Sequence, residues 1–311
     1  MASTAGSTAV DTAISGPQSG GISQRLSDFC TFLYDSEQGK VLGRTGKSWG
    51  QIGFFYLIYY ACLTGFFAGM LAVFYHTLDW NTPKLLGSDS LLKQTPGLAF
   101  RPLPNVETTL IRFNKARAST YTPYVDHIES FIQYYENEYQ QTESGIMVDC
   151  STFTEYRPLD DWDKACRFDI VDLGADCVKQ QSFGYEDGQP CVLLKLNRIF
   201  DWMPEPYTNE TRPSEIADTW SEYSISVNCE GENPADKDNI GDIYYFPKSG
   251  FHFKYFPYRN QQGYRSPLVF VRFDNPNPAQ LLMITCKVYA KNIKHDAMER
   301  AGMVHFELMV D

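Results

Sequence analysis

Ile52-Gly-Phe-Phe-Tyr-Leu-Ile-Tyr-Tyr-Ala-Cys-Leu-Thr-Gly-Phe-Phe-Ala-Gly-Met-Leu-Ala-Val-Phe74 is the stretch of sequence that decides the fold. It lies within an uncharged segment, residues 48–78, that is bracketed by Lys47 and Asp79. A helix of this length, rising about 1.5 Å per residue, crosses the hydrocarbon core of a bilayer. A buried core helix of this length normally shows a polar stripe, and this segment has none. The sequence therefore predicts a single transmembrane helix over 48–78. One such segment excludes a helix-bundle channel built from this chain alone.

The charges that flank this segment predict its orientation. Lys40, Arg44 and Lys47 precede it, and the positive-inside rule places basic flanks in the cytosol. The segment also lies too far from the N-terminus, and is too long, to be a cleaved signal peptide. We therefore expect an uncleaved signal anchor of type II topology. Residues 1–47 would form a cytosolic tail and residues 79–311 an extracellular domain.

The cysteines and a glycosylation sequon support this orientation. Six of the eight cysteines follow the apolar segment: Cys150, Cys166, Cys177, Cys191, Cys229 and Cys286. An even set confined to one side suits an oxidising compartment, although six cysteines allow 15 pairings. The sequon Asn209-Glu210-Thr211 lies on the same side and predicts an N-linked glycan. Cys30 and Cys62 are expected to lie in the cytosol and in the membrane, so neither should form a structural disulfide.

Charge and composition differ between the two sides. Residues 1–47 carry four basic and four acidic residues, so the net charge of −11 falls entirely on residues 79–311. An acidic domain argues against nucleic acid or anionic lipid as a ligand and favours solubility. The small residues at the start of the tail predict disorder to about Gly21. We expect Phe29, Phe32, Leu33 and Tyr34 to pack on the membrane face or on a partner.

Two pairs of residues mark opposite faces of the predicted helix. At 3.6 residues per turn, Tyr60 lies about 40° from Tyr56, whereas Gly65 and Gly69 lie about 180° and 220° from it. An aromatic face can fill a groove on another helix, and a Gly-xxx-Gly face allows close approach. Tyrosine is also common in interfacial belts, and glycine is common in membrane helices. We expect a partner helix on the tyrosine face, and both interpretations stay open for the glycines.

The region after the helix has the pattern of a β-rich domain. Apolar or alternating runs at 191–196, 268–273, 281–289 and 304–310 predict strands. Short strands with long loops and disulfides favour a mainly antiparallel β-sandwich of the immunoglobulin-like class. One helix is predicted to begin at Thr122, as the N-cap, with Pro123 at its first helical position.

The chain contains a series of motifs in a fixed order. They are Leu42-Gly-Arg-Thr-Gly-Lys-Ser-Trp49, Phe55-Tyr-Leu-Ile-Tyr-Tyr-Ala-Cys-Leu63, Pro190-Cys-Val-Leu-Leu-Lys-Leu-Asn-Arg-Ile199, Tyr245-Phe-Pro247 and Tyr255-Phe-Pro-Tyr258. With them, residues 29–311 resemble the beta subunits of the sodium/potassium-transporting ATPase group, which includes the gastric proton/potassium pump. The resemblance implies a non-catalytic plasma-membrane glycoprotein that binds the alpha subunit of a P-type pump. Such a subunit assists assembly and membrane delivery of alpha and tunes potassium affinity.

The resemblance also implies roles for individual residues. Its disulfides pair in sequence order, giving Cys150–Cys166, Cys177–Cys191 and Cys229–Cys286. A helix of alpha would be contacted by Tyr56, Tyr59 and Tyr60. In the family, the cysteine that matches Cys62 can be a redox target, although the simpler interpretation is that Cys62 is a small apolar side chain that fills space. Tyr255, Phe256, Pro257 and Tyr258 would cover an extracellular loop of alpha. Exposed aromatics beside a proline suit an interface, and core packing is the alternative. Phe256 departs from the tyrosine of the family.

Some features of the sequence also fit other functions. A lumenal glycosyltransferase shares the topology, and Asp161-Trp162-Asp163 matches its DxD motif, but a metal site needs further ligands and no α/β pattern is visible. Adhesion through the outer domain is a possible additional role. A proton/potassium pump is the alternative partner, and sodium is favoured because gastric-type chains are a narrower group. The five histidines lack metal-type spacing, so we expect no catalytic residue, metal or cofactor.

Overall fold

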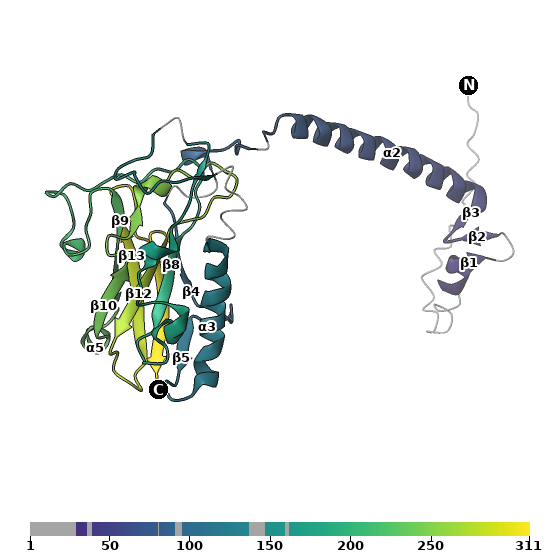
Figure 1. The fold of residues 1–311 in the computed structure, drawn as a ribbon. Helices are drawn as coiled ribbons and strands as arrows, with labels where there is room; N and C mark the ends of the chain where they lie inside the picture. The colour runs from purple at the N-terminus through teal and green to yellow at the C-terminus, as the bar shows by residue number, and fades with distance from the viewer. Residues whose placement is uncertain (1–28, 36–38, 80, 91–94, 137–146, 159–161) are drawn as a thin grey trace, which may run out of the picture. The chain divides into compact units, whose positions relative to one another are not determined.

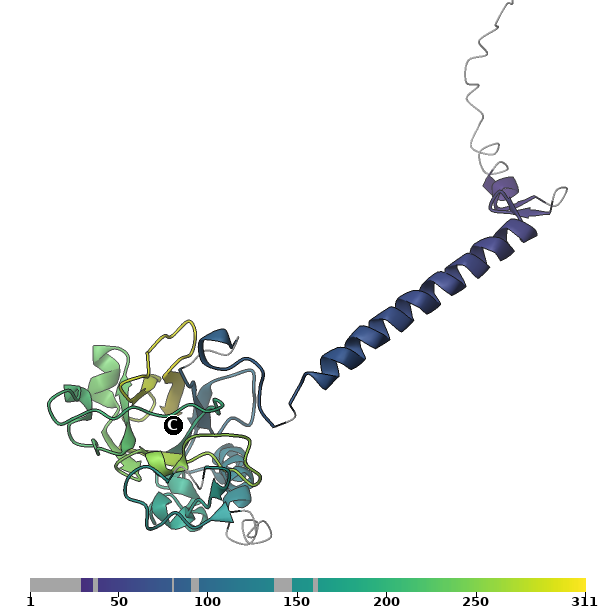
Figure 2. The same ribbon diagram turned by 90° about the horizontal axis from the view of Figure 1, so that it is seen from above.

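The computed structural model describes residues 29–35, 39–79, 81–90, 95–136, 147–158 and 162–311. The chain divides into two compact units, Met1–Leu78 and Asp79–Asp311 (Figures 1 and 2). The predicted disorder of residues 1–21 lies outside the described residues, as does Asp161 of the Asp-Trp-Asp match.

The first unit is dominated by one long helix, α2, which runs from Gly46 to His76. Among the described residues it is the one helix long and apolar enough to cross a membrane, and none of its residues is buried within the unit. It begins and ends two residues earlier than the predicted segment, residues 48–78. At its end, the Thr77 hydroxyl donates to the Phe74 carbonyl at 2.7 Å.

A small β-meander precedes α2. Its strands are β1 (Tyr34–Asp35), β2 (Lys40–Val41) and β3 (Arg44–Thr45). Leu42 and Gly43 join β2 to β3 with positive φ angles of 54° and 74°, the pair of left-handed residues that a two-residue type I′ hairpin requires. The Trp49 indole donates to the Val41 carbonyl at 2.8 Å and ties the meander to the first turns of α2. The sequence predicted an apolar cluster here but not these strands.

The second unit contains two larger sheets, one of four strands in the order β10-β12-β8-β4 and one of five in the order β11-β9-β13-β14-β5. Every neighbouring pair in them is antiparallel except β14 and β5, which are parallel. The strands are β4 Leu98–Arg101, β5 Leu110–Phe113, β8 Cys191–Leu196, β9 Ser224–Gly231, β10 Asp242–Phe246, β11 Phe251–His252, β12 Leu268–Asp274, β13 Leu282–Tyr289 and β14 Met303–Val310. A separate parallel pair joins β6 (Met147–Val148) to β7 (Ala165–Cys166).

Aromatic side chains join the two sheets through one hydrophobic core. The ring of Phe306 in β14 lies 5.0 Å from that of Phe100 in β4 and 6.0 Å from that of Phe273 in β12. Burial of Phe306, Leu308 and Val310 confirms the predicted alternation of the last strand. The other three predicted strands are confirmed as β8, β12 and β13.

Helix α3 spans Ala118–Ile132 and packs beside β5 (Figure 1). The predicted start at Thr122 and Pro123 is wrong, because the helix begins four residues before Thr122. The Thr120 hydroxyl accepts a hydrogen bond from the Asn114 backbone amide at 3.0 Å and donates one to the Arg117 carbonyl at 2.7 Å. These bonds fix the chain just ahead of the helix. Pro123 is exposed within the helix, where burial of Tyr121 and Ile128 outweighs the lost amide.

Short helices and disulfides complete the second unit. The 3₁₀ helices are η1 Gly87–Asp89, η2 Gln133–Tyr135, η4 Ile170–Leu173, η5 Lys179–Gly184, η6 Ser214–Ile216 and η7 Phe253–Tyr255, and α5 covers Pro234–Asn239. Disulfides join Cys150 to Cys166, Cys177 to Cys191 and Cys229 to Cys286, the pairs that the family resemblance implies. The last of them joins neighbouring strands β9 and β13 at the centre of a sheet.

Candidate partner-binding surfaces

An aromatic surface covers one side of α2 near its N-terminal half. The Tyr56 and Tyr60 rings stack with centroids 6.0 Å apart, and those of Phe55 and Tyr59 stack at 6.3 Å. The Tyr59 and Tyr60 rings meet edge to face at 5.4 Å, so the four side chains form one continuous surface. All four are exposed within this unit. Because stacked rings lose little freedom on binding, this surface is suited to a groove on another helix.

The opposite side of α2 is open. A side chain at Gly65 or at Gly69 would meet no atom within 4 Å, so the backbone there is accessible to a second helix. Cys62 lies close to the same side, about 240° from Tyr56, and its thiol is free and exposed, as is that of Cys30. The glycines and Cys62 therefore stay candidate contacts.

The Tyr255–Tyr258 segment does not form the exposed surface that its sequence suggested. Tyr255 and Phe256 are only 4% and 6% exposed, and both belong to the hydrophobic core. Pro257 is buried as well, whereas Tyr258 is partly exposed. The expectation of exposure is wrong for the first three residues because their side chains fill space between core rings: Tyr255 lies 5.5 Å from Phe168.

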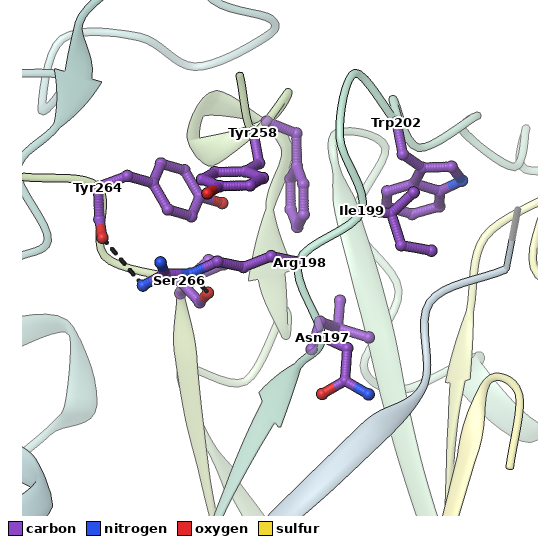
Figure 3. Close-up of a pocket in the computed structure, with 10 residues that line it drawn as sticks. Asn197, Arg198, Ile199, Trp202, Tyr258, Tyr264 and Ser266 are labelled. Atoms are coloured by element: carbon purple, nitrogen blue, oxygen red, sulfur yellow. Dashed lines mark hydrogen bonds between the residues drawn. The ribbon is translucent and has the colours of Figure 1, made fainter. Parts of the chain in front are cut away.

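Tyr258 belongs to a cluster around an arginine. The Arg198 guanidinium lies 5.4 Å from the Tyr258 ring centre and 5.3 Å from that of Tyr264. It donates to the Tyr264 carbonyl at 3.1 Å and to the Ser266 hydroxyl at 3.3 Å, and Figure 3 shows the arginine side chain extending toward both. Trp202 and Ile199 lie on the other side of the same pocket (Figure 3).

This Arg198 cluster is a packed surface and not a ligand pocket. The cavity at its centre has a volume of 10 Å³, which is less than a small organic ligand needs. Burial raises the pKa of the Tyr264 phenol, and the Arg198 charge only partly opposes it, so the phenol stays neutral at physiological pH. The cluster therefore presents one exposed cation held between two aromatic rings.

A second arginine extends the cluster. The Arg259 guanidinium lies 4.7 Å from the Trp162 ring centre and donates to the Asp201 carboxylate at 2.6 Å. The sequence did not point to Arg198, Tyr264 or Arg259. Their loops lie about 60 residues apart in the chain. The pairing of β8 with β12 and the bridge between Phe200 and Tyr258 bring them together.

The predicted glycosylation site lies on an exposed loop. Asn209 is exposed, and the hydroxyl of Thr211, the third residue of its sequon, accepts from the Thr208 amide at 3.0 Å. The asparagine is therefore accessible from solvent.

The described residues contain no group of three or more histidine, cysteine, aspartate or glutamate side chains placed to hold a metal. Asp163, the described aspartate of the Asp-Trp-Asp match, is exposed. Among the described residues, the Asp-Trp-Asp match therefore has no further metal ligands beside it.

Comparison with known proteins identifies relatives along nearly the whole chain. Residues 20–306 match the family model described as sodium/potassium ATPase beta chain. The chain is 37% identical to a probable sodium/potassium-transporting ATPase subunit beta-3 of Caenorhabditis briggsae, over 91% of this chain and 86% of that one. It is 36% identical to subunit beta-2 of Drosophila melanogaster, over 90% of each chain. Subunit beta-1 of Tetronarce californica is 32% identical over 90% of this chain and 94% of its own.

Proposed function

Because the chain belongs to the sodium/potassium ATPase beta chain family, we propose that it is the non-catalytic beta subunit of a P-type sodium/potassium pump. The observation that carries the proposal is the exposed aromatic surface of α2, formed by Phe55, Tyr56, Tyr59 and Tyr60. A lone membrane helix with such a surface needs a partner, and the ten-helix alpha subunit supplies helices for it to contact.

We propose type II topology in the plasma membrane. Residues 1–47 form the cytosolic tail, residues 48–78 cross the lipid bilayer, and residues 79–311 form the extracellular domain with a glycan on Asn209. The basic residues before α2 and the three disulfides after it support this orientation. The two sheets with a common core fit an immunoglobulin-like sandwich.

On the extracellular side, we propose that the Arg198 cluster contacts a loop of alpha. Arginine and tyrosine are enriched at interface hot spots, and Tyr258 and Arg198 both reach solvent. Tyr255, Phe256 and Pro257 would then act from the core, by holding Tyr258 in place. This assigns the contact to fewer residues of the motif than the sequence suggested.

The proposed mechanism is that the beta subunit makes better contacts with one conformation of the alpha subunit than with the others. If the aromatic surface of α2 fits the potassium-occluded form of alpha better than the other forms, the beta subunit raises potassium affinity by that difference in binding free energy. Contact with helices and loops of alpha would also cover its exposed apolar surfaces during synthesis, which accounts for help with assembly and delivery.

Purification of the full chain in mild detergent tests the identity of the partner. We expect an ATPase that needs both sodium and potassium to copurify. Potassium stimulation without sodium would instead identify a proton/potassium pump. Absence of any ATPase from a chain with its disulfides intact would refute the subunit proposal.

Removal of two rings tests the mechanism. We expect Tyr56→Ala combined with Tyr60→Ala to lower the apparent potassium affinity by about three- to tenfold. Two rings that pack against a helix of alpha would contribute about 1 kcal/mol or more to the conformation that they fit. Potassium activation of the copurified ATPase measures this. The matched control is Phe54→Ala with Ile58→Ala, at the same depth on the side that carries Gly65 and Gly69. It should leave potassium activation unchanged, because the proposed tuning comes from the tyrosine side.

Equal effects of the two double variants would contradict a specific role of the tyrosine face. Surface biotinylation must accompany both assays, because a fall in delivery alone would indicate an assembly role without potassium tuning.

A further inference from the structure

A second hollow lies between α3 and the segment that carries η4 and η5. Its volume is 300 Å³, twice the size of a cavity that holds benzene and within the range of ligand pockets. It shares no residue with the surfaces described above. Most of its lining residues are apolar, and the largest of these are Ile132, Ile170, Leu173, Val178, Phe183 and Phe270.

A strained turn holds one wall of this hollow in place. Ser182 and Phe183 both have a φ of 50°, a left-handed conformation that costs a non-glycine residue about 1–2 kcal/mol. The buried Phe183 ring packs 5.9 Å from the Phe270 ring of β12. The disulfide between Cys177 and Cys191 anchors the same turn to β8. The wall is therefore preformed, and a ligand need not order it.

The rim of the hollow carries an excess of negative charge. Lys179 forms an ion pair with Glu129, and Glu136 and Asp126 also lie close enough to raise the pKa of its ammonium group. Of these groups, Glu129, Glu136 and Lys179 line the hollow. Two carboxylates face one ammonium group, and Asp126 adds a third negative charge nearby. A bound molecule would therefore meet an apolar interior and a rim that favours cations.

We propose that this hollow binds a small amphiphilic amine, with its apolar body against Phe183 and Phe270 and its ammonium group at the rim beside Glu136. The apolar walls provide burial of the body, and the excess carboxylate selects the charge of the head. Glu136 is the carboxylate that selects it, since Glu129 is occupied by Lys179.

Tryptamine is a suitable probe, because it joins an indole body to a primary ammonium group. Indole-3-acetate has the same ring with a negative charge and is the matched control ligand. Ligand-observed NMR on the full chain in mild detergent measures saturable binding of each. We expect tryptamine to bind about fivefold or more tightly than indole-3-acetate. The rim carboxylates, which are exposed to water, attract the ammonium group of tryptamine and repel the carboxylate of indole-3-acetate.

Two pairs of variants localise the binding. Val178→Phe fills the hollow and should abolish saturable binding of tryptamine. Val171→Phe, whose residue is 78% exposed on neighbouring η4 and outside the hollow, should bind like wild type. Glu136→Gln should lower tryptamine affinity about two- to fivefold and leave indole binding intact. Glu186→Gln, on an exposed loop, should leave tryptamine affinity unchanged.

Equal affinity for the two ligands would overturn the proposal, and so would unchanged tryptamine binding in Val178→Phe. If Val178→Phe fails to fold, Glu136→Gln decides, because its exposed side chain carries no packing role. An unchanged preference for tryptamine over indole-3-acetate in that variant would then contradict the proposal.

Discussion

Single residues of the Tyr255–Tyr258 segment have different environments although they are adjacent in sequence. Tyr255 and Phe256 pack in the core, and Tyr258 lies against Arg198 at the surface. The residue types do not distinguish these places, because aromatic side chains suit both a core and an interface. Only the contacts of the folded chain separate them.

Arg198 provides a prediction at this scale. Arg198→Met should lower the thermal midpoint of the full chain by about 2–4 °C, because it removes two cation–π contacts and the hydrogen bonds to Tyr264 and Ser266. Arg198→Lys keeps the charge and should lose less. Thermal unfolding followed by tryptophan fluorescence measures the change. A midpoint equal to wild type in Arg198→Met would refute a stabilising role for the cluster.

His305 provides a second prediction at the scale of single residues. Its ring lies 2.7 Å from the Glu232 carboxylate and 3.0 Å from that of Glu307. Burial lowers the pKa of His305, but the hydrogen bonds and charges of Glu307 and Glu232 outweigh it, so the net pKa is above 6.5. The pKa values of both carboxyls are lowered from 4.5. The hydrogen bond from Thr285 is the largest cause of the lowered pKa of Glu232. Burial raises the pKa of Glu307, but the hydrogen bonds to Thr109 and His305 outweigh it.

The sign of the pH dependence follows from these shifts. A histidine with a raised pKa stabilises the fold fully below pH 6.5, and this contribution is lost as pH rises through the raised value. The carboxylates stabilise it above pH 4.5, and that contribution is lost as pH falls through their lowered values. The difference in thermal midpoint between wild type and His305→Gln should therefore be largest between these limits and smaller at about pH 8.5. A difference that is constant with pH would contradict this account.

At the scale of elements, helix α3 shows which local signals decide a boundary. A threonine followed by a proline is a common start for a helix, yet α3 begins four residues before Thr122. Thr120, which bonds the Asn114 backbone from inside the helix, is the residue that fixes the start. The helical spacing of the apolar residues was readable from the sequence, and the long-range burial of Tyr121 that extends the helix was not.

Two matched variants test this boundary. Thr120→Val keeps the branched shape but removes the hydroxyl, which leaves the Asn114 amide without its partner, so the free energy of unfolding should fall by about 1–2 kcal/mol. Thr122→Val removes an exposed hydroxyl that donates to the Ala118 carbonyl within the same helix, and it should have little effect. Thermal unfolding of both full-length variants measures the difference. Equal loss of stability in the two would show that Thr120 has no special role at the boundary.

At the scale of the whole molecule, the sequence contained enough to predict the apolar helix and the late strands. Their signals are a charge-free run and short apolar or alternating runs, which depend on local order alone. The meander before α2 and the Arg198 cluster could not be predicted in this way. The meander depends on a two-residue turn and one indole hydrogen bond, and the cluster depends on loops joined by strand pairing.

The sequon tests the orientation of the whole chain. With residues 79–311 outside the cell, Asn209 should carry one N-linked glycan, and treatment with an N-glycosidase should lower the apparent mass of wild type but not of Asn209→Gln. The exposed loop around Thr208 and Thr211 makes the residue accessible to the transferase. An unglycosylated chain that is still delivered to the cell surface would argue against a lumenal passage of this domain.

The parallel pairing of β14 with β5 has a consequence for the order of events during synthesis. β14 lies between β13 and β5 in its sheet, although β5 leaves the ribosome about 190 residues earlier. Until Met303–Val310 has emerged, β5 has no neighbour in its sheet and the Phe100 ring lacks the Phe306 ring on which it stacks. Nascent chains therefore pass through a long interval with an open sheet edge, during which chaperones are the natural protection against aggregation.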